Sequence, residues 1–110
     1  MSDDVIVRLA ETIRQRRSEE SSRSYTKQLL EAGAERCARK LGEEAVEVVI
    51  AGISQDSKAL TAESADLLYH LLVLLESRGI AWSDVAAELE RRMGTSGLAE
   101  KAARGGGTAS

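Results

Sequence analysis

The sequence predicts an all-α protein, a helical bundle of about four to five helices that is completed by dimerisation. The 110-residue chain contains no Pro and no Phe, and its only aromatic residues are one Trp and two Tyr. It is rich in Ala, Leu, Glu and Arg, which are strong helix formers. Val and Ile never alternate with polar residues over the length of a strand. The length suits one domain, expected over residues 1–98, with a tail at 99–110 whose last residues we expect to be disordered.

The positions of the helices follow from apolar periodicity. Over residues 3–17, Val5, Leu9 and Ile13 recur at four-residue spacing and form one apolar stripe. Four further helices with apolar faces are expected over residues 25–32, 34–53, 58–78 and 84–93.

Residues with strong local preferences mark where these helices begin and end. Ser24 and Ser83 are the expected N-caps of the second and fifth helices. Gly33 and Gly79 are the expected stops of the second and fourth helices. The segment SQDS is the expected turn between the third and fourth helices.

The fourth helix suggests an assembly. Every position of residues 67–75 is apolar except His70, when Tyr69 is counted as apolar. A helix that is apolar on all faces must be buried on all faces. One domain of this size has few other helices to cover it, so we expect a homodimer or a larger even oligomer. The alternative is a central helix in a compact monomer.

The charge and composition favour a cytoplasmic protein that binds neither nucleic acid nor membranes. The net charge of −3 gives no basic surface of the kind that binds nucleic acid. Cys37 is the only cysteine, so nothing suggests disulfides or an oxidising compartment. The acidic N-terminus lacks the basic start of a signal peptide. The longest apolar run is interrupted by His70 and is too short to span a bilayer.

Acidic residues stand on the two helices that look most buried. Glu44 and Glu47, three residues apart, share one helix face, and so do Glu63 and Asp66. If these two helices pack antiparallel across the SQDS turn, the two acidic pairs can face each other. Converging carboxylates repel one another, so we expect a hard cation between them, with Mg²⁺, Mn²⁺ and Ca²⁺ all suited to oxygen ligands. A di-iron site would require Glu-x-x-His pairs, which are missing here.

The alternative for these acids is an ordinary solvated helix face. Glu43 and Glu44 could pair with Arg39 and Lys40 along the same helix. Asp66 argues against this alternative, because it lies among apolar residues and buried carboxylates are rare unless they are paired or bind a metal.

The acidic pattern, Glu-Glu-x-x-Glu followed after a spacer by Glu-x-x-Asp, resembles the all-α nucleoside triphosphate pyrophosphohydrolases, which include MazG-like enzymes and dimeric dUTPases. Four stretches add a closer match: SYTKQLL, ARKLGEEAVEVVIA, ESADLLYHLLVLL and GTSGLAEKAAR. With them, about residues 5–104 resemble the phosphoribosyl-ATP pyrophosphatase family of histidine biosynthesis.

The resemblance implies a Mg²⁺-dependent hydrolase that cleaves the α–β phosphoanhydride of phosphoribosyl-ATP to give phosphoribosyl-AMP and pyrophosphate. It implies that the metal ligands are Glu44, Glu47, Glu63 and Asp66. Glu43 would bind the metal through water or orient the attacking water. The general base is left open among the catalytic candidates, which are Glu43, Glu44 and Glu47. The ion would lower the pKa of a bound water and neutralise the triphosphate.

Further residues are candidates for binding the substrate. Lys40 lies one turn before the acids and can reach a phosphate, or can form an ordinary ion pair along the helix. Ser24, Tyr25 and Thr26 place hydroxyls at a helix N-terminus, which is a natural anion site; the alternative is capping plus one core aromatic. Lys27 could approach a phosphate or be solvated.

Two other functions remain open at this point. One is a house-cleaning pyrophosphohydrolase that acts on another nucleoside triphosphate, since the acids do not encode recognition of the base or the ribose. The other is a non-catalytic helical interaction module whose acids are solvated. We expect His70 and Cys37 to be core residues.

Overall fold

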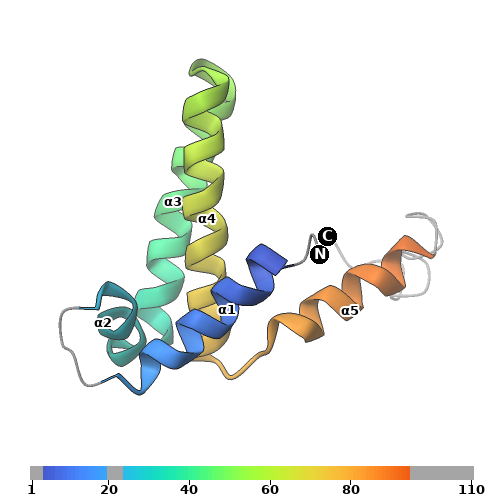
Figure 1. The fold of residues 1–110 in the computed structure, drawn as a ribbon. Helices are drawn as coiled ribbons and strands as arrows, with labels where there is room; N and C mark the ends of the chain where they lie inside the picture. The colour runs from blue at the N-terminus through green and yellow to red at the C-terminus, as the bar shows by residue number, and fades with distance from the viewer. Residues whose placement is uncertain (1–3, 20–23, 95–110) are drawn as a thin grey trace, which may run out of the picture.

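The computed structural model describes residues 4–19 and 24–94, which form five helices and no strand (Figure 1). The expected all-α class is therefore confirmed. The tail at 99–110 and residue 3, the expected start of the first helix, lie outside the described residues. The helices are α1 (Asp4–Arg17), α2 (Tyr25–Ala32), α3 (Ala34–Ser54), α4 (Ser57–Ser77) and α5 (Trp82–Met93).

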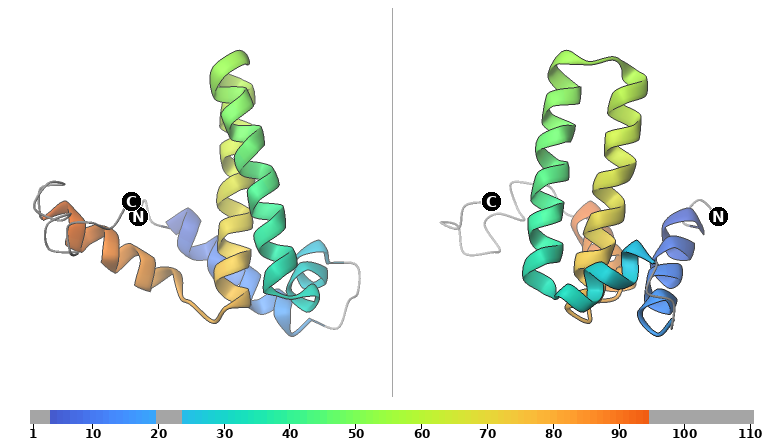
Figure 2. Two further views of the ribbon diagram at one scale, coloured as in Figure 1. Left: turned by 180° about the vertical axis from the view of Figure 1, so that it is seen from behind. Right: turned by 90° about the vertical axis from the view of Figure 1, so that its left-hand side faces the viewer.

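The long helices α3 and α4 form an antiparallel hairpin that rises away from the other helices (Figures 1 and 2). Only Gln55 and Asp56 separate the two helices. Asp56 caps α4, because its Oδ1 accepts a hydrogen bond of 2.9 Å from the backbone N–H of Ala59. The expected SQDS turn is confirmed, and with it the antiparallel packing on which the predicted acidic site depends.

Two glycines end helices as expected. Gly33 closes α2 with φ of +100°, in the region that favours glycine. Gly79 has φ of +72° and follows the end of α4. The N–H of Ile80 then donates to the carbonyl of Leu75 over 2.9 Å, which is the backbone bond of a Schellman motif.

The core lies at the base of the hairpin, where α1 packs on α4 and α2 packs on both α3 and α4. Ile13 is fully buried there, as the apolar stripe of the first helix predicts. Val5 belongs to the same stripe but is 61% exposed, because no described element covers the first turn of α1. The buried cluster consists of Ile13, Leu29, Leu30, Cys37, Leu72 and Val73.

The start of α5 differs from the expectation. The helix begins at Trp82, and the preceding residue, Ala81, offers no side-chain cap. Ser83 therefore lies in the first turn and is not the N-cap. Trp82 packs against the core cluster, and this tertiary contact places the helix start before Ser83. No residue of α5 is fully buried.

One chain already covers most faces of the apolar segment at 67–75. His70, Leu72 and Val73 are buried by packing within the chain, whereas Leu68 remains 41% exposed. The expectation that a second copy must cover this helix thus loses part of its basis, and dimerisation stays a prediction. Among the described residues, no helix combines the length and the apolarity that crossing a membrane requires.

Candidate active site

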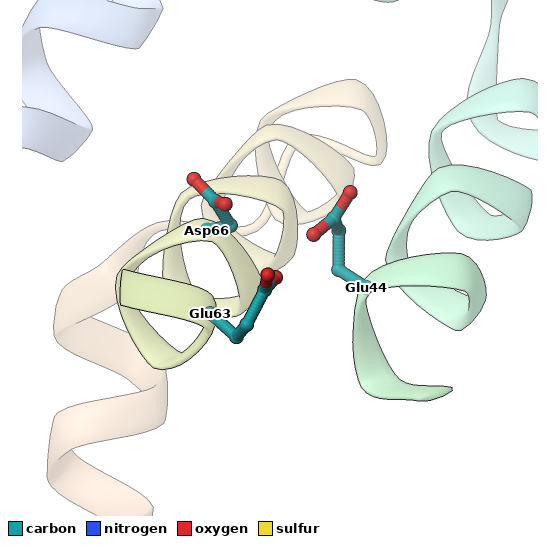
Figure 3. Close-up of side chains that lie close together, drawn as sticks. All are labelled: Glu44, Glu63 and Asp66. Carbon is teal, nitrogen blue, oxygen red and sulfur yellow. The ribbon is translucent and has the colours of Figure 1, made fainter. Parts of the chain in front are cut away.

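Three of the predicted acids meet between the two helices of the hairpin. Glu44 reaches from α3 towards Glu63 on α4, and Asp66 lies one turn further along α4 (Figure 3). Each residue offers one carboxylate oxygen, and these three oxygens all lie within 4.8 Å of one another. The antiparallel hairpin therefore brings acids from both predicted pairs to one place.

The charges at this place oppose one another. The pKa of Glu63 is raised above its ordinary value, first because the carboxyl is partly desolvated, and then because of the negative charges of Glu47, Asp66 and Glu44. Like charges held this close favour protonation of one member or the binding of a cation. The metal-free site is thus electrostatically unfavourable when it is fully ionised.

The two remaining acids lie outside the three-carboxylate cluster. Glu47 is exposed and stands outside the set whose oxygens lie within 4.8 Å, although its charge contributes to the raised pKa of Glu63. Glu43 is also exposed, and its Oε1 accepts a hydrogen bond of 3.1 Å from Nζ of Lys40. Of the four predicted metal ligands, three are assembled in this conformation and Glu47 is close by.

Asp66 is exposed, so the expectation that it is buried is wrong. The reason is that the upper part of the hairpin stands clear of α1 and α2, which pack at its base (Figure 1). Glu44 and Glu63 are half-buried. The evidence for a cation site is therefore the convergence of the carboxylates and not the burial of Asp66.

The donor set of this cluster fits a hard divalent cation. All three donors are carboxylate oxygens, which are the preferred ligands of Mg²⁺ and Ca²⁺. Neither sulfur nor imidazole nitrogen belongs to the cluster. Mg²⁺ usually binds through a few carboxylates and retains several waters, and half-exposed side chains leave room for both water and substrate phosphate.

Lys40 is a cationic side chain on α3, one turn before Glu43 and Glu44. Its ion pair with Glu43 confirms the local pairing considered as an alternative for this lysine. The pKa of Lys40 is raised, first by the hydrogen bond to Glu43 and then by the charges of Tyr25, Glu43 and Glu44. The ion pair with Glu43 is thus the contact that the structure shows for Lys40.

The first turn of α2 contains the other predicted substrate-binding residues. Ser24 is the N-cap, and its Oγ accepts a 3.2 Å hydrogen bond from the N–H of Lys27. Nζ of Lys27 lies 3.5 Å from a carboxylate oxygen of Glu31. Thr26 is buried, and its hydroxyl forms a hydrogen bond with the hydroxyl of Tyr69. Tyr25 is 47% exposed. Ser24, Tyr25 and Lys27 remain accessible here, whereas Thr26 anchors α2 to α4.

An aromatic cluster joins α2 to α4 and was not foreseen from the sequence. The rings of Tyr25 and Tyr69 stack with centroids 6.4 Å apart, and the ring of His70 meets both edge-on. His70 is buried and both of its ring nitrogens have partners, which confirms that it is a satisfied core residue. The sequence contains the motifs SYT and LLYHLL, but their spacing along the chain does not predict that their aromatic rings are in contact.

A separate cavity lies away from the acidic cluster. A cavity of about 460 Å³ opens between α1, the end of α4 and the start of α5. Its apolar lining includes Leu72, Leu75 and Trp82, and none of the predicted site residues contributes to it. This cavity is therefore separate from the three-carboxylate cluster.

Comparison with known proteins shows which proteins the chain is similar to. The family described as phosphoribosyl-ATP pyrophosphohydrolase matches residues 6–93. A phosphoribosyl-ATP pyrophosphatase of Cereibacter sphaeroides is 52% identical over 101 residues, which cover 92% of this chain and 98% of the relative. One of Agrobacterium fabrum is 65% identical over 81 residues, covering 74% and 76%. Phosphoribosyl-ATP pyrophosphatase 1 of Bradyrhizobium diazoefficiens is 56% identical over 96 residues, covering 87% and 91%.

Proposed function

The chain belongs to the phosphoribosyl-ATP pyrophosphohydrolase family, and from this premise we propose how its residues carry out the reaction. The activity is hydrolysis of phosphoribosyl-ATP to phosphoribosyl-AMP and pyrophosphate, the second step of histidine biosynthesis. The observation that carries the proposal is the meeting of Glu44, Glu63 and Asp66 across the hairpin. We place the reaction in the cytoplasm.

We propose Mg²⁺ as the cofactor. Glu44, Glu63 and Asp66 would hold it, with Glu47 joining as a fourth ligand from the next turn of α3. When bound, Mg²⁺ lowers the pKa of a coordinated water and offsets the negative charge of the phosphates. This removes the apparent conflict between an acidic protein and a polyanionic substrate.

The carboxylates also direct the attacking water. The oxygen of the water forms a bond to phosphorus, and one of Glu43, Glu44 and Glu47 accepts the proton that this water loses. The bond between the α- and β-phosphoryl groups breaks, and pyrophosphate leaves. Glu43 is exposed and accepts a hydrogen bond from Lys40, which supports a role for it in orienting a water that approaches from solvent.

Cationic and hydroxyl groups would bind the remainder of the substrate. The ammonium of Lys40 can exchange its exposed partner, Glu43, for a phosphate oxygen. Ser24 can donate its hydroxyl proton, because its oxygen only accepts in the cap. Lys27 lies in the same turn, and Thr26 secures that turn against α4.

We propose further that the working enzyme is a homodimer or a larger even oligomer. An apolar stripe on α3 supports this: Val46, Val49, Ile50 and Ile53 recur at three- and four-residue spacing and all are exposed. Apolar residues in such a row on a protruding hairpin are typical of a surface that another subunit covers.

The test is a pyrophosphate-release assay on the purified chain. We expect turnover of phosphoribosyl-ATP with Mg²⁺, loss of turnover with EDTA, and much slower release from a panel of ordinary nucleoside triphosphates. Glu44→Gln should lower kcat by orders of magnitude, because it removes a predicted ligand of the ion. Glu35→Gln, on the same helix but away from the cluster, is the matched control. Equal turnover of the whole panel would indicate a house-cleaning enzyme instead.

A further inference from the structure

His70 is a buried residue that the proposed reaction does not use. It is the only histidine in the chain and is 7% exposed. Its Nδ1 lies 2.9 Å from the backbone oxygen of Asp66, one turn earlier on α4. Its Nε2 lies 3.3 Å from the hydroxyl oxygen of Tyr25 on α2. The imidazole therefore connects the helix of two metal-binding candidates to a residue predicted to bind substrate.

These two contacts determine which ring nitrogen carries the proton of the neutral imidazole. A backbone carbonyl can only accept, so the N–H must be on Nδ1 and must donate to Asp66. Nε2 then has a lone pair and accepts from the hydroxyl of Tyr25. The single hydroxyl proton of Tyr25 is thus engaged by His70, and only the lone pairs of its oxygen are left for another partner.

We propose that His70 is a positioning residue that fixes Tyr25 as a hydrogen-bond acceptor for a sugar hydroxyl of the substrate. The inference rests on the proposed function and deepens it. A phosphate oxygen is also an acceptor, so it has no bond to form with Tyr25 in this state, whereas a ribose hydroxyl can donate. The phosphates are left to cationic groups such as Lys40, whose ion-pair partner is the exposed Glu43.

The surroundings of Tyr25 explain why a positioning residue is needed. Tyr25 is the first residue of an eight-residue helix and its side chain is 47% exposed. Stacking on Tyr69 orients the ring but leaves the direction of the hydroxyl proton free. Without His70, the proton could turn towards water or phosphate, and the oxygen would no longer be reserved for a donor.

Two substitutions of His70 separate its two contacts. His70→Gln places an amide oxygen near the position of Nε2, so it keeps an acceptor for Tyr25 and gives up the bond to Asp66. His70→Asn places an amide N–H near the position of Nδ1, so it keeps the bond to Asp66 and gives up Tyr25. Tyr25→Phe removes the hydroxyl directly. Tyr69→Phe is the matched control, because it removes the other hydroxyl bond between α2 and α4.

The assay measures KM and kcat for phosphoribosyl-ATP together with the melting temperature. We expect Tyr25→Phe and His70→Asn each to raise KM about two- to tenfold, the range of one hydrogen bond, with little change in kcat. The double variant should be no worse than either single variant, because both remove the same interaction. His70→Gln should stay within about twofold of the parent. Tyr69→Phe should lower the melting temperature and raise KM less than Tyr25→Phe does.

The tautomer has a readout that does not depend on turnover. Since the chain has one histidine, ¹⁵N spectra report a single imidazole, which should carry its proton on Nδ1, and the Nε2 signal should shift in Tyr25→Phe. A proton on Nε2, or His70 variants that lower stability without changing KM, would overturn the inference. If the parent hydrolyses no phosphoribosyl-ATP, the proposed function fails, while the spectra still decide the state of Tyr25.

Discussion

Glu63 is the residue on which the charges of the site act most directly. Its pKa is raised first by partial desolvation and then by three neighbouring carboxylates, and a bound cation would offset the repulsion from those carboxylates. The pKa of Glu63 is higher in the folded than in the unfolded protein. The metal-free fold therefore loses stability as pH rises from the unfolded pKa through the folded pKa. The side chain is thus unfavourable to folding without an ion and favourable with one.

Replacing Glu63 with Gln should separate these two effects. In EDTA at neutral pH, Glu63→Gln should melt at the same temperature as the parent or higher, because one repulsive charge is gone. With Mg²⁺ at about a hundredfold its Kd, the parent should gain about 2.7 kcal/mol and the variant much less. Turnover should fall by orders of magnitude. Paired thermal melts and the pyrophosphate assay measure all three, with Glu35→Gln as control.

A purely structural carboxylate would give the opposite pattern in those melts. Its removal would destabilise the protein equally with EDTA and with Mg²⁺, and near-parental turnover would remain. That outcome would show that Glu63 is not a ligand of the metal ion.

The acids of the site could be predicted because helical spacing determines which side chains share a face. Glu63 and Asp66 follow from that rule alone, and the two-residue turn then brings Glu44 opposite them. The exposure of Asp66 could not be predicted in this way, because it depends on where α1 and α2 pack. The link from Tyr25 to His70 was missed for the same reason, since it joins residues far apart in sequence.

At the scale of the helices, α5 is stabilised largely by interactions between its own side chains. It has no fully buried residue and no side-chain N-cap. Instead, Glu88 accepts hydrogen bonds from Arg91, at 2.6 Å, and from Arg92, at 2.9 Å. These contacts, three and four residues apart, hold the last turns of the helix together.

The pH dependence of α5 should therefore follow Glu88. Its pKa is lowered to about 2, first by the hydrogen bond to Arg91 and then by that to Arg92. Because the pKa of Glu88 is lower in the folded protein, its ionised carboxylate stabilises the fold fully above the ordinary pKa of 4.5. This stabilisation is lost as pH falls towards 2. NMR titration of the Glu88 carboxyl measures this, and a midpoint near 4.5 would show that the pairs do not persist in solution. Glu88→Gln should abolish the dependence.

Helix ends could be predicted where one residue type determines the local backbone. Gly33 and Gly79 adopt positive φ angles that favour glycine, so both stops were visible in the sequence. The start of α5 was not, because Trp82 is held by the core and not by a capping side chain. Local chemistry thus predicts an end, whereas tertiary contacts can move it.

At the scale of the whole molecule, the apolar surface left uncovered lies on the protruding hairpin. The stripe of Val46, Val49, Ile50 and Ile53 on α3 faces solvent within one chain. The sequence predicted an interface at residues 67–75 instead, because it does not reveal that α1, α2 and α3 cover most of that helix. Leu72 is consequently a core residue, and a charge placed there would test folding rather than assembly.

A lysine at Val49 should test assembly without disturbing the single chain. Val49 is 58% exposed, so Val49→Lys should change monomer stability by no more than about 0.5 kcal/mol. If a second copy covers this stripe, the buried charge should shift the assembly towards monomer. Val5→Lys, an exposed valine on α1, is the matched control. Sedimentation analysis decides: a parent mass near 11.8 kDa over a wide dilution range would exclude the oligomer.

The two-residue turn also has a kinetic consequence. Because Glu44, Glu63 and Asp66 all belong to one hairpin, the proposed ligands of the ion are local in sequence and should meet as soon as the hairpin forms, before α1 and α5 dock. An ion bound at that early stage would stabilise the folding transition state. Mg²⁺ should therefore mainly speed refolding, whereas a site assembled last would slow unfolding alone. Stopped-flow refolding with EDTA and with Mg²⁺ measures the difference.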